Sequence, residues 1–76
     1  MSVVVRTWGL DSHQRVSPLP ETGFLVVELV SGDVTTTIGR ESQRRAAGEF
    51  WTVPPGVSMA VDTGDDAAVL QTFAVR

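Results

Sequence analysis

The sequence contains no cysteine, tyrosine, lysine or asparagine, and its single histidine is His13. Without cysteine, the chain can form neither disulfides nor thiolate metal sites. Without lysine or cysteine, Schiff-base and thiol nucleophilic catalysis are excluded, and the lack of tyrosine excludes a phenolic general acid. An acid–base mechanism would therefore have to use His13, a carboxylate or bound water.

A basic charge balance and long apolar runs are also absent. The net charge is −3 and the pI is near 4.8, whereas nucleic-acid-binding domains usually present a basic face. No apolar run approaches the roughly 18 residues that span a bilayer. The first residues, MSVVVRTWGLD, lack the apolar stretch and the small-residue cleavage site of a signal peptide. We therefore expect a cytoplasmic protein with no nucleic-acid or membrane partner.

The 76 residues, 42% of them hydrophobic, predict one globular domain over residues 1–76. A domain of this size buries only about 60% of the surface that its unfolded chain exposes, so its core is marginal. Small domains usually gain stability from disulfides, a metal or a partner subunit. Because disulfides are excluded, a homodimer becomes the expected source of stability if a metal is also missing.

Glycine and proline divide the chain into short segments rich in valine and threonine, which favour strands. Residues 40–48 (RESQRRAAG) are too short and polar for a packed helix, and we interpret them as a hairpin connection with charged, solvated ends. About seven short strands separated by turns predict an all-β sandwich or barrel. The expected strands are residues 2–8, 13–17, 24–31, 34–38, 50–53, 57–62 and 67–75.

Residues 24–31 (FLVVELVS) are the most apolar of these segments. Their alternate side chains form two faces: Leu25, Val27 and Leu29 on one, and Phe24, Val26, Glu28 and Val30 on the other. A strand that is apolar on both sides is usually covered on both. One small barrel covers only one face, so the other predicts a dimer interface, with exchanged strands as one form of it. Ordinary exposure of apolar surface is the alternative.

Glycine and proline are regularly spaced in residues 48–59 (GEFWTVPPGVSM). Gly48 opens a turn into a strand, Pro54 ends that strand by removing a ladder donor, and Gly56 permits a tight reversal. The segment resembles the second conserved motif of the cupin superfamily, which runs glycine, five residues, Pro-x-Gly, two residues and a metal-binding histidine. Met59 stands where that histidine would be.

Gly32 resembles the closing glycine of the first cupin motif, in which a His-x-His pair precedes a glutamate, six residues and the glycine. Counting back places Leu25 at the glutamate, and Leu19 and Glu21, or Pro18 and Pro20, at the histidine pair. The resemblance covers roughly residues 18–75 and implies a small jelly-roll β-barrel or sandwich. One glutamate and no histidine cannot supply the about three protein ligands of a catalytic metal site. We therefore expect neither a metal nor another cofactor.

The candidate ligand-contacting residues fall into two groups. Leu25 and Met59 should point into the barrel, either as core or as the wall of an apolar pocket in its mouth. His13 and Arg15 are two residues apart and would share a strand face. The resemblance to the metal-free epimerases and isomerases of the superfamily implies that they act there as a general base and an anion-binding arginine. The polar rim that they would join also includes Glu21, Thr36 and Gln71. A solvated strand face is the alternative interpretation.

Trp8 and Trp51 are large apolar side chains with one hydrogen-bond donor each. Packing in a core or an interface is the ordinary expectation, and stacking on a sugar or an aromatic ligand is the functional one. Three arginines in residues 40–48 form a small basic cluster, but two glutamates lie close by, so we interpret the cluster as solvated surface.

Two functions of different classes follow. The first is a metal-free, cupin-like binding or structural protein, a homodimer, with a small organic molecule as the ligand of its barrel mouth. The second is a metal-independent isomerase, epimerase or cyclase that acts on a sugar or small organic acid with His13 as its base. The metal-free sugar epimerases of the superfamily are similar in expected fold, but they pair a histidine with a tyrosine, which this chain lacks.

Overall fold

The computed structural model describes residues 2–18 and 20–75. These residues form eight strands: β1 Val3–Leu10, β2 Arg15–Val16, β3 Leu25–Ser31, β4 Asp33–Ile38, β5 Glu41–Ala46, β6 Phe50–Val53, β7 Met59–Thr63 and β8 Ala68–Val75. They lie in two four-stranded antiparallel sheets, in the orders β1-β8-β3-β6 and β2-β7-β4-β5. These orders define a jelly roll, as the sequence predicts. Across residues 2–18 and 20–75, no helix is long and apolar enough to cross a membrane.

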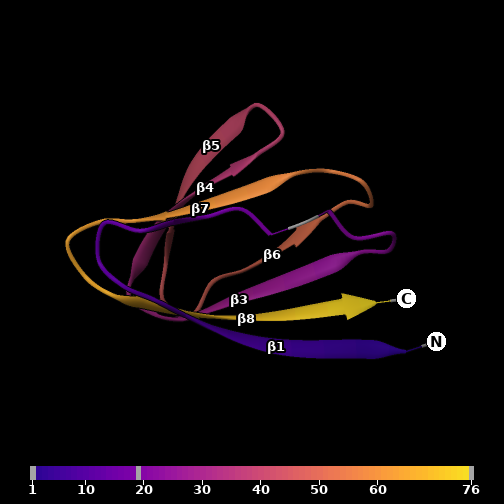
Figure 1. Ribbon diagram of the computed structural model, residues 1–76, viewed down its shortest axis with the longest axis horizontal. Helices are drawn as coiled ribbons and strands as arrows, with labels where there is room; N and C mark the ends of the chain where they lie inside the picture. Colours follow the sequence, from indigo (N-terminus) through magenta and orange to yellow (C-terminus); the bar gives the residue numbers. More distant parts are fainter. Residues whose placement is uncertain (1, 19, 76) are drawn as a thin grey trace.

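The two sheets form two layers (Figure 1). Strands β1, β8 and β3 run side by side in one layer, β7 and the β4–β5 hairpin lie in the other, and both chain termini lie at the same end. Strand β1 pairs with β8 along its whole length, from Val3 opposite Val75 to Leu10 opposite Ala68. Among the described strands, β8 is the one that pairs with β1, so β1 is an edge strand of its sheet.

Alternate apolar residues fill the space between the sheets. In β3, Leu25, Val27 and Leu29 are buried, whereas Val26 and Glu28 are only half-buried, so the predicted period of two is confirmed. Strand β8 alternates in the same way along all its residues. The core cluster comprises Leu10, Leu25, Val27, Leu29, Val34, Trp51, Val53, Met59, Val61, Ala68, Leu70 and Ala74.

Residues 40–48 are mostly exposed, as their polarity predicts, but they are not merely a hairpin connection. Their central part is strand β5, which pairs with β4 from Asp33 opposite Ala46 to Ile38 opposite Glu41. Strand β5 lies at the edge of its sheet and is mostly exposed. Edge strands are often charged because charges discourage pairing with other chains. This strand therefore lacks the apolar alternation by which the sequence could have shown it.

The second strand is also shorter than the predicted range of 13–17, since β2 contains only Arg15–Val16. His13 has a φ of 54°, which is left-handed backbone that interrupts a strand. It lies in a turn, and its N–H donates to the carbonyl oxygen of Gly64 at 2.8 Å. His13 and Arg15 therefore do not share a strand face.

Gly32 connects β3 to β4 at a place where only glycine fits. Its φ is 86°, and a Cβ there would lie 2.5 Å from the carbonyl oxygen of Ala67. The ladder between β3 and β8 shifts register between Leu29 and Ser31, as at a β-bulge, which bends a strand sharply. The glycine that resembles the end of the first cupin motif thus allows the chain to pass from one sheet to the other.

Candidate functional site

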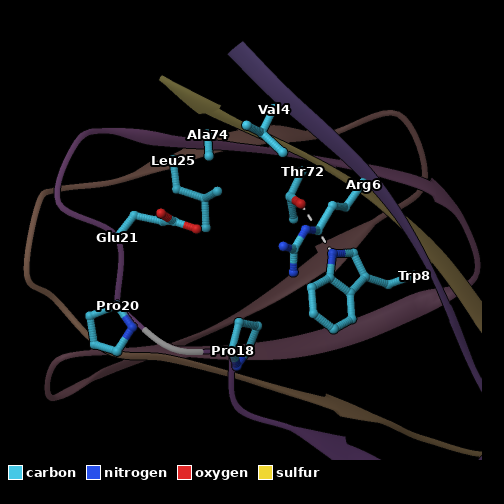
Figure 2. Close-up of a pocket in the computed structure, with 9 residues that line it drawn as sticks. All are labelled: Val4, Arg6, Trp8, Pro18, Pro20, Glu21, Leu25, Thr72 and Ala74. Atoms are coloured by element: carbon cyan, nitrogen blue, oxygen red, sulfur yellow. Dashed lines mark hydrogen bonds between the residues drawn. The ribbon is translucent and has the colours of Figure 1, made fainter. Parts of the chain in front are cut away.

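A cavity of about 440 Å³ opens between the inner face of β1 and the connection from β2 to β3. Figure 2 shows its walls, which come from strands far apart in the sequence and from the β2–β3 connection. They are Val4, Arg6 and Trp8 of β1, Leu25, Thr72 and Ala74 of β3 and β8, and Pro18, Pro20 and Glu21 of the connection. Small-molecule sites usually have volumes of about 300–1,000 Å³. The cavity is therefore large enough for a small organic molecule.

The indole of Trp8 is a fixed wall of this cavity. Its Nε1–H donates a hydrogen bond to Oγ1 of Thr72 at 3.0 Å, drawn as a dashed line in Figure 2. Thr72 is buried and lies opposite Arg6 across the β1–β8 ladder. The bond therefore holds the indole beside the side chain of Arg6.

Two charged side chains reach the cavity from different elements. Arg6 extends from β1 into its middle, and the carboxylate of Glu21 lies across from it on the β2–β3 connection (Figure 2). The other lining side chains are apolar apart from Thr72, whose hydroxyl already accepts the Trp8 hydrogen bond. A mostly apolar cavity with a few polar groups is typical of sites for small organic ligands.

The positions that resemble cupin metal ligands come together in space. Pro18, Pro20, Glu21, Leu25 and Met59 all line a second, much smaller cavity of about 10 Å³, which shares four of them with the larger one. The N–H of Gly56 donates to the carbonyl oxygen of Glu21 at 2.9 Å, which ties the two motif regions together. Leu19, the other position compared with the histidine pair, lies outside the described residues.

The side chains at these positions do not fit a metal ion. Leu25 has no donor atom, and the Met59 sulfur accepts a hydrogen bond from Nε1 of Trp51 at 3.4 Å. Glu21 contributes one carboxylate. In the part of the chain that the structure describes, no group of three or more His, Cys, Asp or Glu side chains is positioned to hold a metal. Since catalytic metals take about three protein ligands, no step through a metal is derived from this site.

The predicted site residues of the barrel interior are divided between cavity and core. Glu21 and Leu25 line the larger cavity, and Met59 lines the smaller one. Trp51 is buried, and the guanidinium of Arg45 lies 4.7 Å from its ring centroid. It therefore packs in the core and lines neither cavity.

The polar residues expected on one rim are dispersed. Gln71 is opposite Thr7 in the β1–β8 ladder and lies at an outward position of β8, between two buried neighbours. Thr36 is buried and accepts a hydrogen bond from Nε of Arg45 at 3.1 Å. The structure brings neither of them to Glu21.

His13 and Arg15 lie on the outside, away from the cavity walls. Nε2 of His13 is 3.5 Å from Oδ1 of Asp65, and its side chain is 71% exposed. Nη1 of Arg15 is 3.0 Å from Oδ2 of Asp62 in an exposed ion pair. The β1–β2 and β7–β8 connections that surround His13 lie at the end of the molecule opposite the termini (Figure 1).

Sequence reasoning missed Arg6 and did not connect it with Trp8. The signal was present, because Val4, Arg6 and Trp8 alternate along the first strand and therefore share a face. An arginine in the middle of such a face ordinarily indicates solvent, however. The pairing of β1 with β8, together with the prolines of the β2–β3 connection, makes this face the wall of a cavity.

Solved structures of cupins are similar to this one over nearly its whole length. A cupin protein from Bacteroides fragilis has a TM-score of 0.88 and 16% identity, covering 100% of this chain and 67% of its own. A cupin domain from Schizosaccharomyces pombe has a TM-score of 0.86 and 15% identity, with coverages of 99% and 57%. A conserved protein of unknown function from Streptococcus pyogenes has a TM-score of 0.85 and 23% identity, with coverages of 100% and 66%. The chain thus has the cupin fold.

The chain spans 57–67% of the length of these three proteins. No family model and no curated protein matches the sequence. The glycine and proline spacing therefore led to the correct fold at a level of identity where whole-sequence similarity is slight. These similarities establish the fold, and the role of the chain has to be argued from its own site.

Proposed function

We propose that the protein is a metal-free binding module that holds a small organic molecule in the mouth of its barrel and works as a homodimer. The observation that carries the binding proposal is the cavity of about 440 Å³. Its apolar walls offer contact area to a ligand. The two charged side chains, Arg6 and Glu21, would fix the orientation of that ligand. Ligand sites usually combine these two features.

An enzymatic role with His13 as general base gains no support from the position of this residue. A general base has to lie within hydrogen-bond reach of the proton that it removes. His13 belongs to an exposed turn and does not line the cavity. We therefore propose binding and not turnover.

The homodimer proposal rests on the outer face of the β1-β8-β3-β6 sheet. The exposed large hydrophobic residues all belong to these strands or border them, and they are 48–61% exposed: Val3, Val5, Phe24, Val30 and Phe50. Phe73 lies between Val5 and Val26 in the register of the sheet, so the apolar surface is continuous across three strands.

Charge is nearly absent from this outer face. In the described residues of the four strands, the charged side chains are Arg6 and Glu28. Arg6 points into the cavity, which leaves Glu28 as the one charge on the outer side. Contiguous apolar surface of this kind commonly marks an interaction site.

A second copy of the chain is the occupant that suits this face. An interface across a two-fold axis needs a surface that is complementary to itself, and two apolar sheet faces can pack on each other at about 10 Å. Each chain has a net charge of −3, so two copies repel each other. The repulsion is smallest when they meet at a face that carries little charge. The contact would also supply the apolar burial that a small domain without disulfides lacks.

Native mass spectrometry of the freshly purified chain tests the assembly. We expect the mass of two chains, and a monomer at micromolar concentration would contradict the homodimer. The same spectrum reports organic molecules that co-purify with the protein.

The cavity is tested by NMR, with the indole N–H resonance of Trp8 as the reporter and that of Trp51, which lies in the core, as the internal reference. Small organic acids, amides and alcohols are titrated separately. We expect at least one of these classes to shift the Trp8 resonance and leave the Trp51 resonance in place. If none shifts Trp8, the binding proposal fails.

A further inference from the structure

We infer that the cavity selects organic monocarboxylates and that Arg6 is the residue that binds the carboxylate. This inference rests on the proposed function, since it names the class of ligand for the same cavity. It begins from the position of Arg6 on β1. Val4 and Trp8, its neighbours on the inner face of the strand, line the cavity with it, so the cation projects between apolar side chains.

The guanidinium of Arg6 is available to a ligand. Within residues 2–18 and 20–75, it makes no hydrogen bond or ion pair with another side chain. Arg15 and Arg45 differ in this respect, because Arg15 pairs with Asp62 and Arg45 donates to Thr36. Arg6 is instead directed into the cavity (Figure 2).

The donors of the cavity favour a carboxylate. A guanidinium presents a planar fork of N–H groups that matches the two oxygens of a carboxylate. The Trp8 N–H already donates to Oγ1 of Thr72, and the hydroxyl of Thr72 is a neutral donor in the same wall. Recognition of a negatively charged acceptor at this place therefore falls to Arg6, which is the cation among the described lining residues.

The remaining walls restrict the ligand further. Leu25, Ala74 and Pro18 offer apolar contact. This contact stabilises a ligand with a hydrocarbon part but not a small inorganic anion. Among the described residues that line the cavity, Arg6 supplies one positive charge and no other cation accompanies it. A singly charged carboxylate is therefore favoured over a doubly charged phosphate ester.

A purely structural role for Arg6 makes different predictions. Inward-pointing charges on edge strands hinder pairing with other chains, and β1 is an edge strand. If protection of the edge were the whole role, Arg6→Lys would behave like the wild type, because it keeps the charge. Carboxylate recognition requires the fork as well, so Arg6→Lys should bind more weakly.

The test uses three probes with one aliphatic chain and different head groups: hexanoate, hexanamide and hexylamine. Each is titrated into the full chain, with the Trp8 indole N–H as reporter and the Trp51 indole N–H as evidence that the core is intact. We expect hexanoate to bind about tenfold or more tightly than hexanamide, which corresponds to one charge-assisted hydrogen bond. Hexylamine should bind most weakly.

Two variants of Arg6 and one control complete the experiment. Arg6→Gln should remove the preference for hexanoate, Arg6→Lys should reduce it severalfold, and Arg15→Gln on the outer surface should leave it unchanged. If hexanoate and hexanamide bind equally, or if Arg6→Lys retains the full preference, the carboxylate inference is overturned while the cavity remains a binding site. If none of the three probes binds the wild type but another class of small molecule shifts the Trp8 resonance, the carboxylate inference fails and the proposed function stands; if no class shifts it, both fail.

Discussion

The indole Nε1–H of Trp51 donates a hydrogen bond to the thioether sulfur of Met59 at 3.4 Å, and both side chains are buried. Met59 stands where the resemblance to the second cupin motif would place a metal-binding histidine. At this position the chain therefore has a side chain that packs in the core, not one that binds a metal. The sulfur is a weak acceptor, but it gives the buried Trp51 donor a partner and leaves no side-chain donor unsatisfied there.

The first prediction concerns Met59. Met59→Ala should lower the free energy of unfolding by about 2–5 kcal/mol, because it leaves a void in the core. Met59→Leu keeps the volume and should cost less than about 1.5 kcal/mol. Urea denaturation at one fixed protein concentration measures both. Equal effects of the two substitutions would show that Met59 does not pack as described.

The second prediction concerns Gly32, with Gly48 as a matched control. Both have a left-handed φ, of 86° and 94° respectively, but only at Gly32 would a Cβ meet backbone atoms. Gly48→Ala should cost about 1 kcal/mol or slightly more, from the backbone conformation. Gly32→Ala should cost clearly more, because the chain also has to move away from Ala67. Thermal unfolding distinguishes the two, and equal losses would argue against the close approach.

The third prediction tests the homodimer. Val5→Glu introduces a charge on the outer face of the β1-β8-β3-β6 sheet and should weaken dimerisation by about tenfold or more, since burying an unpaired charge is costly. Gln43→Glu adds the same charge on the exposed strand β5 and should not change the dimer. Sedimentation equilibrium measures both constants. An unchanged dimer in Val5→Glu would place the interface elsewhere.

The fourth prediction concerns metal. Protein purified without chelator should contain less than about 0.1 equivalent of iron, manganese, nickel or zinc per chain, because one carboxylate does not form a site. Chelator should leave the unfolding temperature unchanged, since a ligand that is not bound gives no stabilisation. Elemental analysis and a thermal scan with and without chelator provide the measurement. Stoichiometric metal would refute the assignment.

The fifth prediction concerns His13. His13→Gln should change the free energy of unfolding by no more than about 0.5 kcal/mol, as is usual for exposed residues, and it should leave hexanoate binding unaltered. The two measurements are chemical denaturation and the Trp8 titration. A tenfold loss of affinity for hexanoate would show that His13 contributes to the site, and would support the catalytic alternative.

The prediction of the fold succeeded where local chemistry decides the structure. The period of two in residues 24–31 correctly identified the core positions Leu25, Val27 and Leu29, because alternate side chains of a strand point to opposite faces. Gly32 has a conformation that favours glycine, and the spacing of glycine and proline therefore indicated the fold. Strand β5 was missed because a charged edge strand has no alternating apolar pattern to reveal it.

The sequence by itself determined the all-β fold and which residue types stand at the positions that resemble cupin metal ligands, since both follow from residue types and their spacing. The tertiary structure alone decided where the cavity lies and that Arg6 enters it. This depends on β1 pairing with β8, which joins the two ends of the described chain, and on the distant connection that carries Glu21. A local pattern shows which residues share a face, but long-range pairing decides whether that face also forms the wall of a cavity.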